Sequence, residues 1–202
     1  MPVLSVRART TRRFQLRPFR RRDLDVLSEA VVRSLPELHE WLPWAHLGYG
    51  RRDALIYLRD SAKAWEEGRA FDLAVFTHGD PRRQLGSVSV WFRGRQAAAG
   101  EIGYWVRSDE TGKGIATEVT ARVLQIGFEE LEMHRVALRI AVGNRSSERV
   151  AEKIGFVREG LLREELLVRG EWLDHSLWSM LESEYRAARL RFVENGWLEG
   201  SS

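Results

Sequence analysis

The chain has 202 residues, of which 44% are hydrophobic and 30% charged, so it can bury one sizeable core but is short for two full domains. It has no cysteine and no close pair among its five histidines, which excludes disulfides and a thiol nucleophile and gives a metal site little support. The net charge is +3. No apolar run approaches the roughly 18 residues that a membrane span needs, and the N-terminus has no apolar core of signal-peptide length. We therefore expect a cytoplasmic protein without membrane contact.

The first 68 residues are expected to form one strand and three helices. Residues 14–19 alternate apolar and polar side chains, as a half-buried strand does. The expected helices are one capped by Asp23, a short one opened by the capping-box pair Ser34 and Glu37 and carrying Trp41 and Trp44, and one over residues 53–67 that is stopped by Gly68.

The remaining sequence predicts six more strands and three more helices. In order they are strands at 70–77, 85–92 and 101–106, a helix at 115–131, a strand at 136–142, a helix from Ser146 or Ser147 to Ile154, strands at 157–168 and 173–181, and a helix at 182–193. Antiparallel runs interrupted by helices indicate a mixed α/β (α+β) layer of about seven strands, not a doubly wound parallel sheet. No linker or repeat is visible, so we expect one domain over residues 1–202, with its core at about 10–185 and a C-terminal helix and tail at 182–202.

Residues 7–22 contain eight arginines and no acidic residue. Such a run is most simply a solvated face around the first strand, although it could also attract phosphate or an acidic partner surface. Direct binding of nucleic acid is not expected.

The segment from Glu101 to Thr117 is the most informative part of the chain. A strand there runs into a glycine-containing turn that opens a helix, which directs backbone N–H groups and the positive end of the helix dipole at one point. The natural guest is a phosphate or pyrophosphate, although a plain strand-to-helix connection would have the same pattern. A Walker loop is excluded because Gly114, not Ser or Thr, follows Lys113, and a Rossmann fingerprint is excluded because Thr117 stands where its third Gly or Ala would be.

Two motifs resemble the signatures of the GNAT N-acetyltransferase superfamily. Residues 111–116 resemble its acetyl-CoA loop, Gln/Arg-x-x-Gly-x-Gly/Ala, with Gly114 and Ala116 at the small positions and Thr111 as a departure at the Gln/Arg position. Residues 144–156 resemble its second signature, an Asn-x-x-Ser helix start that closes with Lys-Ile-Gly-Phe. The resemblance covers about residues 10–185, and several segments look like the RimJ/RimL branch.

This resemblance implies a transferase that moves an acetyl group from acetyl-CoA to a primary amine by direct attack in a ternary complex, without a metal. The branch acetylates the N-terminal α-amino group of ribosomal proteins, so that acceptor is expected, together with ribosome contact. A small-molecule amine acetyltransferase and a catalytically silent acyl-CoA-binding module are alternatives. A monomer and a homodimer are both open.

The resemblance also implies where acetyl-CoA binds. The strands that contain Glu101 and Val136 should start parallel and splay apart, with helices on both faces of the sheet. Pantetheine would follow the free strand edge, and the pyrophosphate would lie on the loop. The cofactor-binding residues are then Tyr104, Trp105, Val106, Thr111, Gly112, Lys113, Gly114, Ile115, Ala116, Thr117, Asn144 and Ser147.

Glu101 is the candidate general base, and a structural carboxylate is the alternative for it. Ser147 is the candidate acid toward the departing thiolate, although its position also predicts a helix cap, and Tyr104 is an alternative acid. A backbone N–H near Trp105 or Val106 would serve the developing oxyanion. Further candidates around the acceptor are Trp41, Trp44, Trp65, Asp174 and His175, for which core packing or a strand-edge hydrogen bond is the simpler role.

Overall fold

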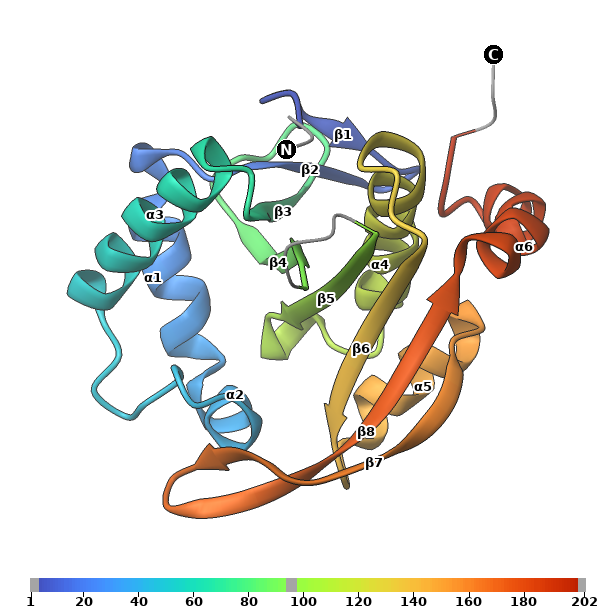
Figure 1. Ribbon diagram of the computed structural model, residues 1–202. Coiled ribbons are helices and arrows are strands. Elements are labelled where there is room, and N and C mark those ends of the chain that lie inside the picture. The colour runs from blue at the N-terminus through green and yellow to red at the C-terminus, as the bar shows by residue number, and fades with distance from the viewer. Residues whose placement is uncertain (1–3, 94–97, 200–202) are drawn as a thin grey trace.

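The computed structural model describes residues 4–93 and 98–199, so residues 1–3, 94–97 and 200–202 of the expected domain lie outside the described residues. Eight strands form one sheet in the order β1-β2-β3-β4-β5-β6-β8-β7. Their bounds are β1 Arg9–Thr10, β2 Phe14–Pro18, β3 Ala70–Thr77, β4 Gln84–Phe92, β5 Ala99–Val106, β6 Arg135–Ala141, β7 Val157–Val168 and β8 Glu171–Leu181. All pairs are antiparallel except β5 with β6, which confirms the mixed, mostly antiparallel sheet (Figure 1).

Helices cover both faces of this sheet. They are α1 Leu24–Arg33, α2 Leu35–Trp41, α3 Arg51–Glu66, α4 Ile115–Gln125, α5 Arg145–Ile154 and α6 Glu182–Glu194. Along β5, Trp105 packs with the apolar cluster of α1, α2 and α3, whereas Tyr104 packs with the cluster that contains α4 and α5. Successive strand residues point to opposite faces, so these two groups of helices lie on opposite sides of β5 (Figure 1).

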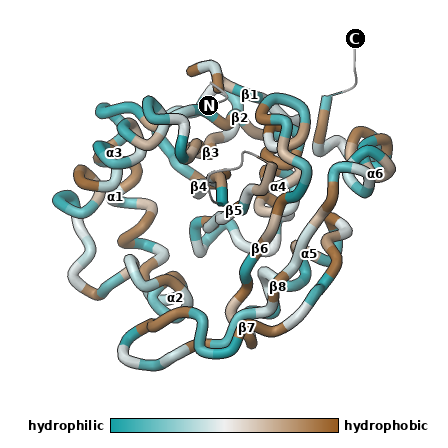
Figure 2. Tube along the Cα trace, in the orientation of Figure 1, coloured by the Kyte–Doolittle hydropathy of each residue, from teal (hydrophilic) through white to brown (hydrophobic). Residues whose placement is uncertain are grey.

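The core forms where amphipathic elements turn their apolar sides inward. In α1, Leu27, Ala30 and Val31 are buried at helical spacing, and β3 contributes Phe71 and Leu73, which are fully buried. Figure 2 shows hydrophobic and hydrophilic residues alternating along α1 and α3, as this packing requires.

The parallel strands β5 and β6 separate partway along their length. Their register pairs are Ala99 with Arg135, Gly100 with Val136 and Glu101 with Ala137, yet β5 continues to Val106 and β6 to Ala141. The other side of β5 stays paired with β4 as far as Val106. The expected splay is therefore confirmed, and the side of residues 102–106 that faces β6 has no strand partner in the described part of the chain.

Several local predictions need correction. The strand β1 is an eighth strand, of two residues. The capping box at Ser34 is wrong, because the Ser34 hydroxyl donates to the carbonyl of Ala30 and the Glu37 carboxylate accepts from Ser108. Trp44 lies beyond the end of α2, and Asp23 precedes α1 without a side-chain cap, because its carboxylate binds Arg17.

The helix expected at 115–131 changes its winding at residue 126. The α-helical part ends at Gln125, and a π-helical segment, Ile126–Glu130, follows it. None of the helices within the described ranges has the length and hydropathy needed to cross a membrane.

Candidate active site

The loop between β5 and α4 exposes a run of backbone donors. Gly112 and Gly114 both have φ of +76°, a left-handed conformation that a side chain would strain. This conformation turns the chain sharply into α4, and the N–H groups from Gly112 to Thr117 have no hydrogen-bond acceptor among the described residues. A helix N-terminus with free N–H groups favours an anion.

Two ion-pair groups fix this loop. At its start, the buried Arg107 donates to Glu29 of α1 (Nη2–Oε1, 2.6 Å) and to Asp109 (Nε–Oδ1, 2.7 Å). The hydrogen bond from Arg107 holds the pKa of the Glu29 carboxyl below its usual value. At its end, Arg13 donates to Glu118 of α4 (2.7 Å) and to the carbonyl of Lys113 (3.0 Å). The loop is therefore anchored to α1 and to the β1–β2 turn.

A cavity of about 380 Å³ lies at the splay between β5 and β6. Its lining includes Glu101, Tyr104, Asn144, Ser147 and His175, all of which were candidates from the sequence. The cavity therefore brings together side chains from β5, α5 and β8. Trp105, Val106 and the loop residues 111–117 do not line this cavity; they lie farther along the same strand and into α4.

Tyr104 and Ser147 form a hydroxyl pair in this cavity. Their oxygens, Oη and Oγ, are 2.8 Å apart, and burial raises the pKa of Tyr104 to about 12, so the phenol keeps its proton at neutral pH. Asn144 is the N-cap of α5, because its Oδ1 accepts from the N–H of Ser147 (3.1 Å). The alternative role of Ser147 as the cap is thus wrong: α5 begins at Arg145, and the hydroxyl of Ser147 is directed to Tyr104 instead.

Glu101 lies at the point where the strands part. It is 8% exposed, and its Oε2 accepts from Arg93 (2.6 Å) and lies 3.5 Å from Nε of Arg139. Burial raises the pKa of Glu101, and the hydrogen bond from Arg93 opposes that shift. The carboxylate is thus held in place by two cations while it faces the cavity. This geometry suits a positioned base and a structural carboxylate alike.

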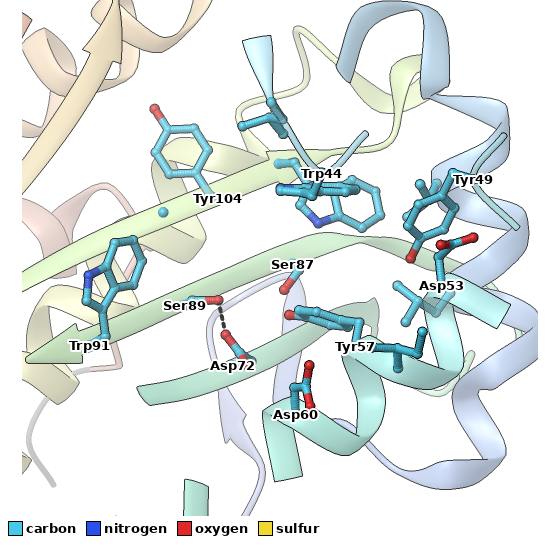
Figure 3. Close-up of a pocket in the computed structure, with 16 residues that line it drawn as sticks. Trp44, Tyr49, Asp53, Tyr57, Asp60, Asp72, Ser87, Ser89, Trp91 and Tyr104 are labelled. Atoms are coloured by element: carbon cyan, nitrogen blue, oxygen red, sulfur yellow. Dashed lines mark hydrogen bonds between the residues drawn. The ribbon is translucent and has the colours of Figure 1, made fainter. Parts of the chain in front are cut away.

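A second cavity, of about 490 Å³, lies under α1 and α3 on the other side of β5. It shares four lining residues with the first cavity, Leu42, Trp91, Gly103 and Tyr104. Figure 3 shows the aromatic rings and carboxylates that surround it. The two cavities therefore meet at the middle of β5.

The second cavity combines aromatic walls with acidic groups. Trp44, Tyr49 and Trp105 are in ring contact, and Asp53, Asp60 and Asp72 also line the space. These carboxylates were not among the site residues expected from the sequence. A signal was present, since Asp53 and Asp60 lie seven residues apart on one helix face and Asp72 interrupts an apolar strand.

The tryptophans and arginines named from the sequence have different positions. Trp44 lines the second cavity and Trp41 the first, but Trp65 packs on Phe71 in the core with ring centroids 5.1 Å apart. In the arginine-rich segment, Arg9 pairs with Glu130 and Arg17 pairs with Asp23. Both arginines are buried, so a solvated face is the wrong description for these two.

The arrangement fits an extended thioester ligand that carries a pyrophosphate. The unpaired side of β5 offers backbone groups to an amide-containing chain, the loop offers N–H groups to an anion, and the first cavity lies at the end of that path. The described part of the chain contains no group of three or more His, Cys, Asp or Glu side chains placed to hold a metal ion.

Comparisons with known proteins agree with this geometry. Residues 13–157 match the family model described as an acetyltransferase (GNAT) domain. The putative ribosomal N-acetyltransferase YdaF of Bacillus subtilis is 30% identical over 171 residues, which cover 83% of this chain and 91% of that protein. A spermidine N(1)-acetyltransferase of Vibrio cholerae is 34% identical over 80 residues, 40% of this chain and 46% of that protein.

Among solved structures, RimJ of Mycobacterium smegmatis in complex with CoA-disulfide has a TM-score of 0.83 to this chain. Its sequence is 27% identical, and the match covers 94% of each chain.

Proposed function

The chain belongs to the GNAT family of acetyltransferases, and from this premise we propose that it transfers the acetyl group of acetyl-CoA to the N-terminal α-amino group of a protein. The observation that carries the proposal is the meeting of two cavities at β5. One lies at the splay between β5 and β6, and the other lies under α1 and α3. A donor and an acceptor can thus approach the same point from opposite sides.

The named relatives support a protein acceptor. YdaF carries a ribosomal N-acetyltransferase name and matches most of both chains. The RimJ structure, which holds a CoA-disulfide, matches over 94% of each chain. A ribosomal protein is therefore proposed as the acceptor. Acetyl-CoA is proposed to bind to this chain as the CoA group binds in the RimJ complex.

Acetyl-CoA supplies the activated acetyl thioester when it is bound. The N–H groups of Gly112 to Thr117 would hold its pyrophosphate, with no side-chain contribution needed at Thr111. The free edge of Tyr104, Trp105 and Val106 would hold its pantetheine arm by strand-like hydrogen bonds. An N–H of this edge near the splay would also donate to the thioester carbonyl oxygen.

The amine must lose a proton before it can attack, since an α-amino group titrates near ~8. Glu101 is proposed as the acceptor of that proton, directly or through water, because it faces the cavity and burial raises its pKa. The Tyr104–Ser147 pair is proposed to donate to the departing sulfur.

The small-molecule alternative has one specific observation in its favour. The second cavity is acidic and aromatic, as a site for a free polyamine would be, and one relative is named a spermidine N(1)-acetyltransferase. That match covers only 46% of the relative, so the protein acceptor is preferred.

The test is a panel of acceptors with acetyl-CoA. Peptides that begin with Ala or Ser, the same peptides with a blocked N-terminus, free lysine and spermidine are compared by CoA release and by mass spectrometry. Acetylation of the free α-amino group in the peptides alone is the expected result. Turnover of spermidine without any peptide would replace the acceptor. Binding of acetyl-CoA with no turnover at all would favour the catalytically silent module.

A further inference from the structure

The cavity under α1 and α3 has the electrostatics of a cation site. Its sixteen lining residues, all from the described part of the chain, include three aspartates and no lysine, arginine or histidine. The three come from two elements that pack together, Asp53 and Asp60 from α3 and Asp72 from β3. Figure 3 shows Asp60 below Tyr57 and Asp72 to the left of it beside Ser89, both on the wall opposite Tyr104.

Two of these carboxylates have no cationic partner among the described residues. Asp53 accepts from the N–H of Gly50 (3.0 Å) and lies 3.3 Å from His46, so it is engaged locally. Asp72 accepts only from the hydroxyl of Ser89, at 2.5 Å, and Asp60 has no hydrogen bond or ion pair to another described residue. Asp72 is half-buried, so its carboxylate loses part of its hydration, and a bound cation would compensate that loss. Asp60 is exposed and adds a second negative charge to the same cavity.

The rest of the wall suits the same guest. Aromatic rings attract ammonium and guanidinium groups through their faces, and Trp44, Tyr49, Tyr57, Trp91 and Trp105 all line this cavity. Burial raises the pKa of Tyr57 above its ordinary value, so its hydroxyl stays a neutral hydrogen-bond donor beside the carboxylates. Aromatic faces with carboxylates on one wall are a receptor for an organic cation.

The distance of Asp60 and Asp72 from the proposed point of acetyl transfer indicates which cation they would bind. The two cavities share Gly103 and Tyr104, where acetyl transfer is proposed, whereas Asp60 and Asp72 lie on the far wall of the second cavity. The amine that reacts beside Gly103 and Tyr104 therefore cannot be the cation that binds to the two aspartates. Resting on the proposed function, we infer that the acceptor carries a second positive charge, a Lys or Arg side chain within its first few residues, which binds at Asp60 and Asp72.

The test compares peptides that differ in one side chain. Each begins with the same residue and carries Lys, Gln or Glu at position 2, 3 or 4. Acetylation kinetics and calorimetric binding are measured for the native chain, Asp60→Asn, Asp72→Asn and the double variant. Asp80→Asn is the matched control, because Asp80 lies beyond the end of β3 and does not line the cavity.

For at least one position, kcat/KM of the Lys peptide should exceed that of the Gln peptide by roughly tenfold, since each charge pair of this exposure contributes about two- to fivefold. The preference should arise in KM and in the binding constant, and it should disappear in the double variant. Asp60→Glu should retain it, and Asp80→Asn should leave it unchanged.

Each other outcome has a distinct meaning. Equal binding of Lys and Gln peptides at all three positions, or a preference that survives in the double variant, overturns the cation site while leaving the proposed acetylation standing. If no peptide is acetylated but spermidine is, the protein acceptor fails, and the site is then judged by whether Asp60→Asn and Asp72→Asn raise KM for spermidine relative to a monoamine; an unchanged KM overturns it.

Discussion

The hydroxyl pair Tyr104 and Ser147 gives the sharpest test of the proposed chemistry. The perturbation is a cycle of Tyr104→Phe, Ser147→Ala and the double variant. Both oxygens line the cavity at the splay, and they are 2.8 Å apart. If they act together as one donor to the departing sulfur, removing either oxygen interrupts the same path.

The expected magnitude follows from that coupling. Loss of a positioned donor lowers kcat by about 10²-fold, and the double variant should also lose only about 10²-fold. The coupling energy is then about 2.7 kcal/mol, because each tenfold change in rate corresponds to about 1.36 kcal/mol. Stability should fall by only about 1 kcal/mol for the lost hydrogen bond.

The assay is the release of CoA thiol followed with a thiol-specific reagent, and the chain contributes no background because it contains no cysteine. Tyr185→Phe is the control: it removes a comparable hydrogen bond, Tyr185 Oη to Glu129 at 2.6 Å, away from both cavities. A double variant that loses 10⁴-fold would show two independent groups. Unchanged kcat in both single variants would refute the proton-donor role.

Three further predictions follow from the site and its surroundings. Gly114→Ala should weaken the thermal stabilisation by acetyl-CoA and lower stability by about 1–2 kcal/mol, because an L-residue is strained at φ +76°; an unchanged shift would remove the loop from the binding site. Glu101→Gln should abolish the acidic limb of the pH–rate profile, since the base must lose its proton as pH rises through a pKa that burial raises above 4.5; a retained limb assigns it to another group. The hydrogen bond from Arg135, with help from Ser179, lowers the pKa of Glu159 to about 2. The charged Glu159 carboxylate therefore stabilises the fold fully above pH 4.5, and this contribution is lost as pH falls through about 2. Chemical denaturation should find Glu159→Gln less stable than the native chain at pH 7 and equal to it near pH 2. An equal difference in stability at both pH values would contradict this assignment.

The sequence predicted those parts of the fold that local pattern determines. Every strand of five or more residues was anticipated, because alternation and turn residues act over that length. The strand β1 was not, since two residues, Arg9 and Thr10, carry no periodicity. Asn144 rather than Ser147 caps α5 because the helix begins at Arg145, one or two residues earlier than the serines suggest.

Long-range pairing was beyond the reach of sequence patterns. Arg9 and Glu130 are 121 positions apart, and Arg13 and Glu118 are 105 positions apart. They form ion pairs only because β1 and the β1–β2 turn lie against α4 and the π-helical segment that follows it. The loop between β5 and α4, with its free N–H groups, could be predicted because its motif is continuous in sequence. The acidic cavity under α1 and α3 could not be predicted, because Asp60 and Asp72 belong to different elements.

The anchoring of Arg107 has a consequence for how the two substrates influence each other. Arg107 begins the loop between β5 and α4 and donates to Glu29 of α1. Leu27 and Val31 of the same helix line the cavity under α1 and α3. Any movement of α1 that accommodates the proposed acceptor would thus reach the loop amides that are proposed to hold the coenzyme. By thermodynamic linkage the effect is reciprocal, so each substrate should change the affinity for the other by the same factor. The hydrogen bonds of Arg107 would connect the two sites.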